Sequence, residues 1–276
     1  MGLPTIQLLA FALAQGALSP IGASLGTSAP LDQGFRHMYN LEFSDAHKTF
    51  AAYVKGHPED PFGATADGAA YLFEELNRLG VLQTELFVDD EAFKGREKPL
   101  PNPTAREKFS GAIAQSQKLA DSTLQRSPSD RNALLATVLN LGLESDYLAL
   151  VEKRDFASLA YTKRGGLAAE KLLAVDPTCY DAYLAIGVEN YILGLKPAPV
   201  RWLLRLYGAE TDKEIGIQKL QLTATKGHYL LPFARLLLAV AALRDNNRDQ
   251  AKDLLRNLVQ EFPNNQLYRR ELTRLQ

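Results

Sequence analysis

The chain has 276 residues, of which 46% are hydrophobic and 23% charged, and its formal net charge is −1. This balance argues against disorder over most of the chain and against a nucleic-acid binder that works by neutralising phosphates. The single cysteine, Cys179, excludes an intramolecular disulfide framework and a metal site built from several thiolates.

We predict that residues 1–30 form a signal-peptide-like or disordered N-terminal segment. No charged residue precedes Asp32, and the apolar run 6–14 has the length of a signal-peptide core. Ala12-Leu13-Ala14 offers a small-x-small cleavage site after Ala14, although no Lys or Arg precedes the run. We therefore expect a secreted or periplasmic protein; the alternative is a cytoplasmic protein with an apolar tail.

Helical patterns fill residues 31–276, which we predict to form one domain. The predicted helical pairs are, in chain order, 31–57; 61–80 with 103–126; 130–152 with 155–175; 179–194 with 212–227; and 232–245 with 248–261. A capping helix at 265–275 follows. Prolines that cannot continue the preceding helix end four of these patterns, at Pro58, Pro128, Pro177 and Pro263.

Helix starts carry their own signals. Asp60 before Pro61 combines an N-cap with proline at the first helical position. Capping boxes begin at Thr104, Thr178 and Thr211, and Asn247 can act in the same way. Local capping chemistry and the longer apolar period therefore agree on where the helices begin.

A spacing of small, small and large residues followed by proline occurs twice. Gly34, Ala46, Phe50 and Pro58 are separated by twelve, four and eight residues, and Ala239, Ala251, Leu255 and Pro263 repeat these intervals. The pattern describes two short helices in close contact, with Gly34 facing Ala46 and Phe50 filling the space toward the next pair. A chain of such pairs forms a solenoid, an architecture that usually binds a partner.

With these residues the chain resembles tetratricopeptide-repeat proteins, whose unit of about 34 residues has Trp, Leu, Gly and Tyr on its first helix and Ala, Phe and Pro on its second. The matching positions are Gly34, Ala46, Phe50 and Pro58; Gly68 and Tyr71; Tyr183 and Gly187; and Leu238, Ala239, Ala251, Leu255 and Pro263. Val138 stands where the third pair should have Gly, and Gly165 where it should have Ala. The resemblance implies an all-α, right-handed α-solenoid of helix-turn-helix pairs with insertions, and a non-catalytic scaffold for protein or peptide partners.

In that family the first helices line the concave face, so the resemblance also implies a partner-binding groove. Its candidate residues are polar and aromatic: Tyr71, Glu74, Asn77, Arg78, Asn140, Glu144, Tyr147, Tyr183, Asn190 and Tyr191. The competing interpretation is that some of them form hydrogen bonds between helices or belong to the core.

Two insertions interrupt the repeats. The segment 195–208 carries the only tryptophan, Trp202, between Arg201 and Arg205. It is a candidate lid over the groove, a helix that touches a membrane peripherally, or a plug in the core. If it covers a cavity, the protein would instead carry a small apolar or lipid-like ligand. The segment 83–102 is predicted to be an exposed loop.

No motif for catalysis, a cofactor or a metal is present in the sequence. Metalloprotease, phosphate-loop and nucleophile-elbow patterns are lacking, and the four histidines do not share a helix face. Cys179 is predicted near a helix N-terminus but has no His placed beside it by the sequence. We therefore expect neither enzymatic activity nor a cofactor; a hydrolase would need acid/base pairs that the sequence does not reveal.

Overall fold

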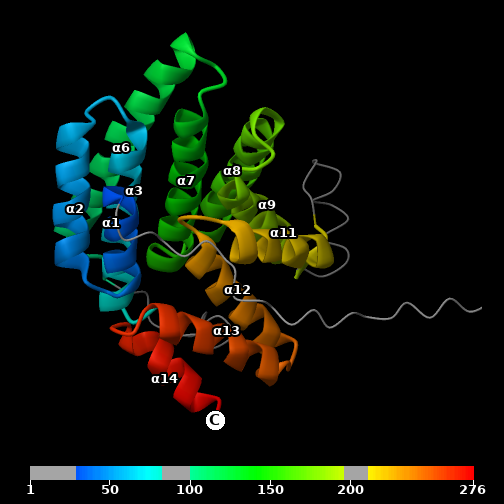
Figure 1. The fold of residues 1–276 in the computed structure, drawn as a ribbon. Coiled ribbons are helices and arrows are strands. Elements are labelled where there is room, and N and C mark those ends of the chain that lie inside the picture. The colour runs from blue at the N-terminus through cyan, green and yellow to red at the C-terminus, as the bar shows by residue number, and fades with distance from the viewer. Residues whose placement is uncertain (1–28, 83–99, 196–210) are drawn as a thin grey trace, which may run out of the picture.

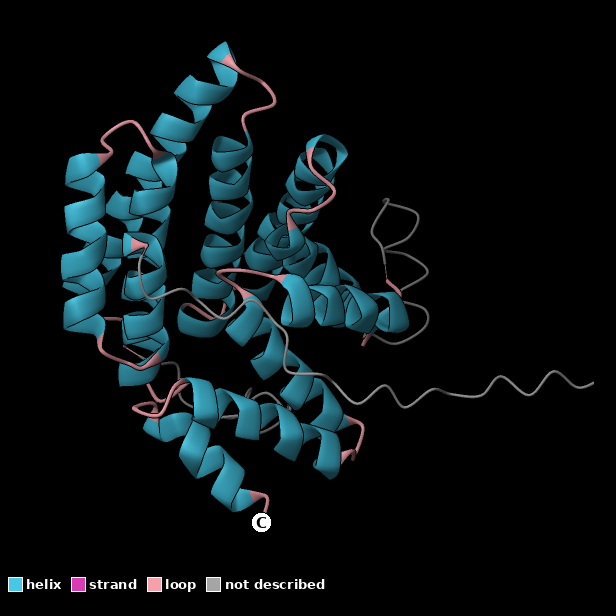
Figure 2. Ribbon diagram, in the orientation of Figure 1, coloured by secondary structure: helices cyan, strands magenta, loops and turns pink. Residues whose placement is uncertain are grey.

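Helices make up all the regular structure in the part of the chain that the computed structural model describes, residues 29–82, 100–195 and 211–276 (Figure 1). Figure 2 shows no strand among these residues. The elements are α1 (Pro30–Tyr39), α2 (Phe43–Gly56), α3 (Pro61–Arg78), α6 (Pro103–Arg126), α7 (Arg131–Asp146), the π-helical turn η1 (Tyr147–Val151), α8 (Asp155–Val175), the 3₁₀ turn η2 (Tyr180–Ala182), α9 (Tyr183–Gly194), α11 (Lys213–Lys226), α12 (Leu231–Arg244), α13 (Arg248–Glu261) and α14 (Gln266–Arg274). The all-α prediction is confirmed.

Neighbouring helices in the chain pack against one another throughout. Contacts run in order from α1 with α2 to α13 with α14, and α3 also contacts α7. The predicted pairs at 61–80 with 103–126 and at 232–245 with 248–261 agree with α3, α6, α12 and α13 to within two residues. The pairing of adjacent helices is therefore as the sequence predicts.

The helix starts show which side chains supply the caps. Asp60 accepts a hydrogen bond from the Phe62 amide, and Asn247 accepts one from Gln250, both as predicted. At α6 and α11, however, the caps are Asn102 and Asp212 instead of the neighbouring Thr104 and Thr211. The side-chain oxygens of Asn102 and Asp212 reach the free amide groups in the first turn of each helix. Asn and Asp are at least as good as Thr at this capping position.

Close packing in the first pair depends on Gly34. The atoms nearest to this position belong to the Phe50 ring and not to Ala46, and an added Cβ would overlap that ring. Phe50 is fully buried and meets Phe35 edge-to-face, with ring centroids 5.5 Å apart. Phe50 therefore packs against α1 within its own pair.

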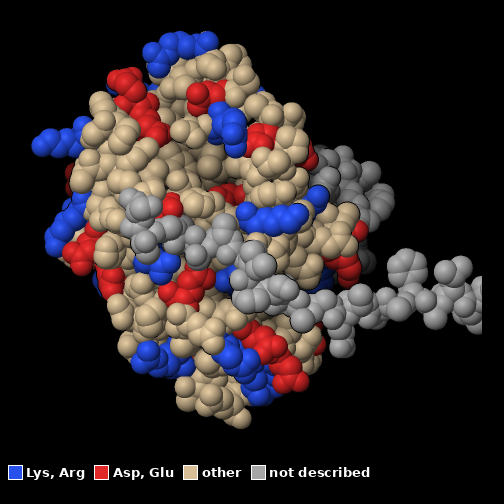
Figure 3. All heavy atoms as spheres, in the orientation of Figure 1, with Lys and Arg blue, Asp and Glu red and all other residues tan. Residues whose placement is uncertain are grey.

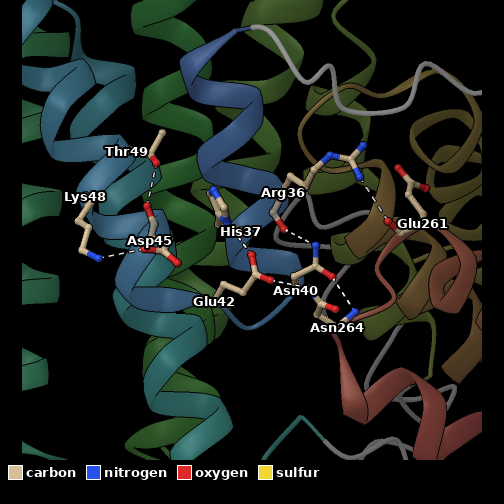
Figure 4. Close-up of polar contacts among 9 residues, drawn as sticks. All are labelled: Arg36, His37, Asn40, Glu42, Asp45, Lys48, Thr49, Glu261 and Asn264. Carbon is tan, nitrogen blue, oxygen red and sulfur yellow. Dashed lines mark hydrogen bonds and ion pairs between the residues drawn. The ribbon is translucent and has the colours of Figure 1, made fainter.

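The first and last helices of the domain touch. Tyr39 Oη donates to the Tyr229 carbonyl at 2.9 Å, and Asn265 Nδ2 donates to the Tyr39 carbonyl at 2.8 Å. The Asn264 amide donates to Asn40 Oδ1 at 3.1 Å, beside a contact between Arg36 and the Glu261 carbonyl (Figure 4). We call this region the closure contact. The closure contact thus joins the first helix of the described domain to residues near its C-terminal end, about 190–226 positions away in the sequence.

One long apolar helix is central. The stretch Arg131–Val151, which comprises α7 and η1, is long and apolar enough by composition to cross a membrane, but most of it is buried inside the protein. Burial of this kind is typical of a core helix surrounded by other helices. In Figure 1, α7 lies between α6 and α8, and it contacts both. α7 therefore lies between the two helices, α6 and α8, that form the sides of the site described next.

Candidate functional site

A cavity of about 220 Å³ lies where α6, α7, η1 and the start of α8 meet. We call it the Tyr147 pocket; the lining residues that matter here are Arg106, Phe109, Glu144, Tyr147, Glu152 and Arg154. A second hollow, beside Tyr39 and Phe73, measures only about 10 Å³, which is too small for a ligand. The Tyr147 pocket is therefore the better candidate for binding.

A change of helix type shapes this pocket. α7 continues into the π-helical turn η1, in which the Glu152 amide donates to the Tyr147 carbonyl at 3.1 Å. Lys153 then adopts a left-handed backbone conformation, with φ of 51°, before α8 begins. Single π-helical turns inside α-helices are frequent at functional sites. The sequence predicts an ordinary helix over 130–152 and gives no sign of this turn.

Glu152 is buried and forms ion pairs with two arginines. Its two carboxylate oxygens lie 2.9 Å from an Arg106 nitrogen and 3.1 Å from an Arg154 nitrogen. The Glu152 side chain is 10% exposed, whereas those of Arg106 and Arg154 are 57% and 59% exposed. The carboxylate therefore lies deep and the guanidinium groups lie at the mouth.

Tyr147 is buried with an unused hydroxyl. The residue is 4% exposed, and its ring stacks on Phe109 at 4.9 Å between centroids. Its hydroxyl has no hydrogen-bond partner among the described residues. Burial is the largest cause that raises the pKa of this hydroxyl. A buried polar group without a partner costs about 1–3 kcal/mol, and because the protein covers this oxygen, the cost falls on the stability of the fold.

Glu144 is a group in the pocket that is available to a guest. It is partly buried, and no hydrogen bond or ion pair of its carboxyl group is found within the described ranges. Burial raises the pKa of Glu144, the Glu152 carboxylate raises it further, and Arg106 acts in the opposite direction. The pocket thus combines one paired carboxylate with one that is not engaged.

Three of the predicted groove residues lie in the interior. Asn140 is buried and hydrogen-bonds to Thr65 Oγ1 and to Ser116 Oγ, while Asn190 donates to the Ile186 carbonyl and accepts from the Asp212 amide. Tyr191 is buried too. For the two asparagines the structure supports the competing interpretation, hydrogen bonds between and within helices, because these side chains meet polar groups brought in by other elements.

The other predicted groove residues are spread over separate surfaces. Tyr71 stacks on His47 with centroids 4.0 Å apart, and His47 Nε2 lies 3.4 Å from Glu74. Arg78 binds Glu75 through two hydrogen bonds of 2.7 Å near the end of α3, and Asn77 is partly buried beside it. Tyr183 donates to the Pro177 carbonyl. Of the ten residues, only Glu144 and Tyr147 line the Tyr147 pocket.

Several predictions fall outside the described residues. These are the N-terminal segment to residue 28, most of the 83–102 insertion, and the candidate lid with Arg201, Trp202 and Arg205. Conversely, Arg106, Glu152 and Arg154 were missed by sequence reasoning. The charged run 152–154 looks like a solvated turn between helices, and nothing local indicates that Glu152 is buried.

Charge on the drawn face of the molecule is mixed. Figure 3 shows Lys and Arg interspersed with Asp and Glu and no broad patch of one sign on that face. Within residues 29–82, 100–195 and 211–276, no three His, Cys, Asp or Glu side chains come together in a way that could hold a metal ion. What the Tyr147 pocket offers chemically is hydrogen bonding and charge pairing. No family model, curated protein or solved structure matches the chain.

Proposed function

We propose that this protein is a non-catalytic scaffold that binds a protein or peptide partner, and that the partner inserts one side chain into the Tyr147 pocket. In this proposal the helical pairs are tetratricopeptide-like units of a right-handed solenoid whose ends are joined by the closure contact. Residues 1–30 support a secreted or periplasmic location.

The observation that carries the proposal is an open cavity lined by Glu144, whose carboxyl group no described side chain engages. The cavity of about 220 Å³ is smaller than the roughly 300–1,000 Å³ of pockets that hold drug-sized ligands or cofactors. It has the size for a single amino-acid side chain. Two exposed arginines at its mouth can bind the backbone or acidic groups of the same partner.

An exposed aromatic residue lies next to the pocket in the chain. Phe156 is 93% exposed, and its neighbour Ala157 lines the pocket. Large aromatic side chains dominate the binding energy of many protein interfaces, and an exposed one near a pocket favours a partner there. Phe156 is therefore the proposed second anchor for the partner.

The pocket geometry favours binding over catalysis. Acid/base chemistry needs two groups that are free to exchange protons with a substrate. Glu152 is held by two arginines, which leaves Glu144 as the one unengaged carboxyl in the pocket. The alternative, a carrier of a small apolar or lipid-like ligand under segment 195–208, gains no support from the described residues.

The test is a selection from a random peptide display library against the full chain. Ser110→Trp places a large ring at the mouth of the pocket, since Ser110 is exposed and lines it. Ala52→Trp makes the same kind of change at an exposed position on α2. Selected peptides should bind wild type and Ala52→Trp equally, and Ser110→Trp about tenfold or more weakly. If no peptide is enriched, or if Ser110→Trp binds as well as wild type at an unchanged melting temperature, the proposal is wrong.

A further inference from the structure

The Tyr147 pocket is acidic at its floor and basic at its mouth. Glu152 is almost completely buried and Glu144 is partly buried, while more than half of the Arg106 and Arg154 side-chain surface is exposed. A side chain that enters from solvent therefore passes positive groups first and ends beside acidic ones. Its tip and its flanks must differ in charge to match this order.

The groups at the floor favour a hydrogen-bond donor at the tip. Glu152 already pairs with both arginines, but the Glu144 carboxyl has no such partner among the described residues. A lysine ammonium carries three donors and a positive charge, so it can pair with the Glu144 carboxylate. Its four-carbon stem can pack along the apolar wall formed by Phe109 and Leu148, both buried.

An acidic tip fits the same floor poorly. A carboxylate at the tip would lie beside both Glu144 and Glu152, and like charges in a partly buried site repel strongly. At the mouth the preference is reversed. Each arginine gives one nitrogen to Glu152, and its remaining N–H groups can bind acidic residues on either side of the inserted chain. Those acidic neighbours would also offset the repulsion between the arginines and an entering ammonium.

We propose that the Tyr147 pocket binds a lysine side chain whose neighbours in the partner sequence are acidic. This inference rests on the proposed function, because it specifies the chemistry of the side chain that the pocket receives. It commits to a protein segment, and a neutral amide side chain at the same position is the competing outcome.

The experiment uses the full chain and fluorescently labelled peptides with blocked ends, in which glutamates flank a central test residue. The test residue is lysine, norleucine, glutamine or glutamate. Norleucine keeps the apolar stem of lysine without its ammonium group. Fluorescence anisotropy measures the dissociation constant of each peptide. We expect the lysine peptide to bind most tightly and the norleucine peptide about tenfold more weakly.

A double-mutant cycle assigns the ammonium to Glu144. Glu144→Gln should weaken the lysine peptide about tenfold and leave the norleucine peptide unchanged, because only the former has the charge to lose. Glu107→Gln, an exposed position on α6, makes the same change of charge nearby and should alter neither. Equal losses for both peptides, or a glutamine peptide that binds as well as lysine, would overturn the inference.

Failure of the inference differs from failure of the proposed function. If library-selected peptides bind wild type and lose affinity on Ser110→Trp while the cycle shows no coupling, the pocket binds a partner but not through lysine. If Ser110→Trp leaves every peptide unaffected, or no peptide binds, the proposed function fails and this inference fails with it.

Discussion

Two buried tyrosines show how the closure contact and the Tyr147 pocket differ. Tyr39 is 2% exposed and its hydroxyl donates to the Tyr229 carbonyl, whereas Tyr147 is 4% exposed and its hydroxyl has no partner among the described residues. At the closure contact the side chains of Asn40 and Asn265 are likewise used in hydrogen bonds. Polar groups that are paired inside the protein stabilise the fold, whereas a buried hydroxyl without a partner lowers its stability.

The largest loss of stability is expected from removing a large side chain at the closure contact. Phe262 is fully buried and its ring lies 5.4 Å from that of Tyr39. Phe262→Ala should lower the free energy of unfolding by about 3–5 kcal/mol through lost burial and a new cavity. Urea denaturation measures the change. A loss below about 1 kcal/mol would mean that the two ends of the domain hardly contribute to stability.

A smaller loss is expected at the first helix pair. Gly34→Ala puts a Cβ into the Phe50 ring and should cost about 1–3 kcal/mol through overpacking. Gly111→Ala is the matched control, because no atom lies within 4 Å of its added Cβ on the exposed face of α6. That control should gain about 0.5–1 kcal/mol from helix propensity. Thermal denaturation measures the melting temperature of both variants. If Gly34→Ala and Gly111→Ala shift it in the same direction, the packing argument is wrong.

The affinity of the lysine peptide should depend on pH through Glu144. The pKa of Glu144 is raised by burial and by Glu152, and Arg106 opposes them. Arg154 also lines the pocket and is charged. The charge of Glu75 on α3 raises the pKa of Tyr147.

The sign of the effect follows from protonation. As the pH falls through the raised pKa of Glu144, the carboxyl becomes neutral and no longer attracts the ammonium. We expect affinity to be highest at neutral pH and to fall about tenfold in acid, and Glu144→Gln to remove most of the dependence. Anisotropy titrations across the range measure this, and an affinity that rises in acid would contradict it.

The smallest effect contrasts the two tyrosines directly. Tyr39→Phe should lower the free energy of unfolding by about 0.5–1.5 kcal/mol, because the Tyr229 carbonyl loses its donor. Tyr147→Phe should leave it unchanged or raise it, because the hydroxyl removed has no partner in the free protein. Urea denaturation in the absence of peptide measures both, and a comparable loss in Tyr147→Phe would show that this hydroxyl is paired after all.

The sequence predicts local features of the fold well because their causes are local. Proline at 103 and 263, together with side-chain caps such as Asp60 and Asn247, sets helix ends within a few residues of chain. The closure contact between Tyr39 and Tyr229 could not be predicted, because its partners are far apart in the sequence and no local pattern brings them together.

The candidate site is predicted only in part for the same reason. Glu144 and Tyr147 were selected by their place on a first helix of the resembled repeat, and the same rule also selected Asn140, which bonds inward to Thr65 and Ser116. A polar residue on a helix does not reveal which neighbour will meet it. The π-helical turn and the burial of Glu152 depend on how α7 and α8 pack, so the sequence alone could not show the pocket.

The most direct test of the central claim is fluorine NMR on protein labelled with fluorotyrosine, with the Tyr147 resonance assigned from Tyr147→Phe. Adding the lysine peptide should shift the Tyr147 resonance, while that of Tyr39 in the closure contact stays in place. A Tyr147 resonance that does not move at peptide concentrations that saturate binding would show that the pocket stays empty and would contradict the account.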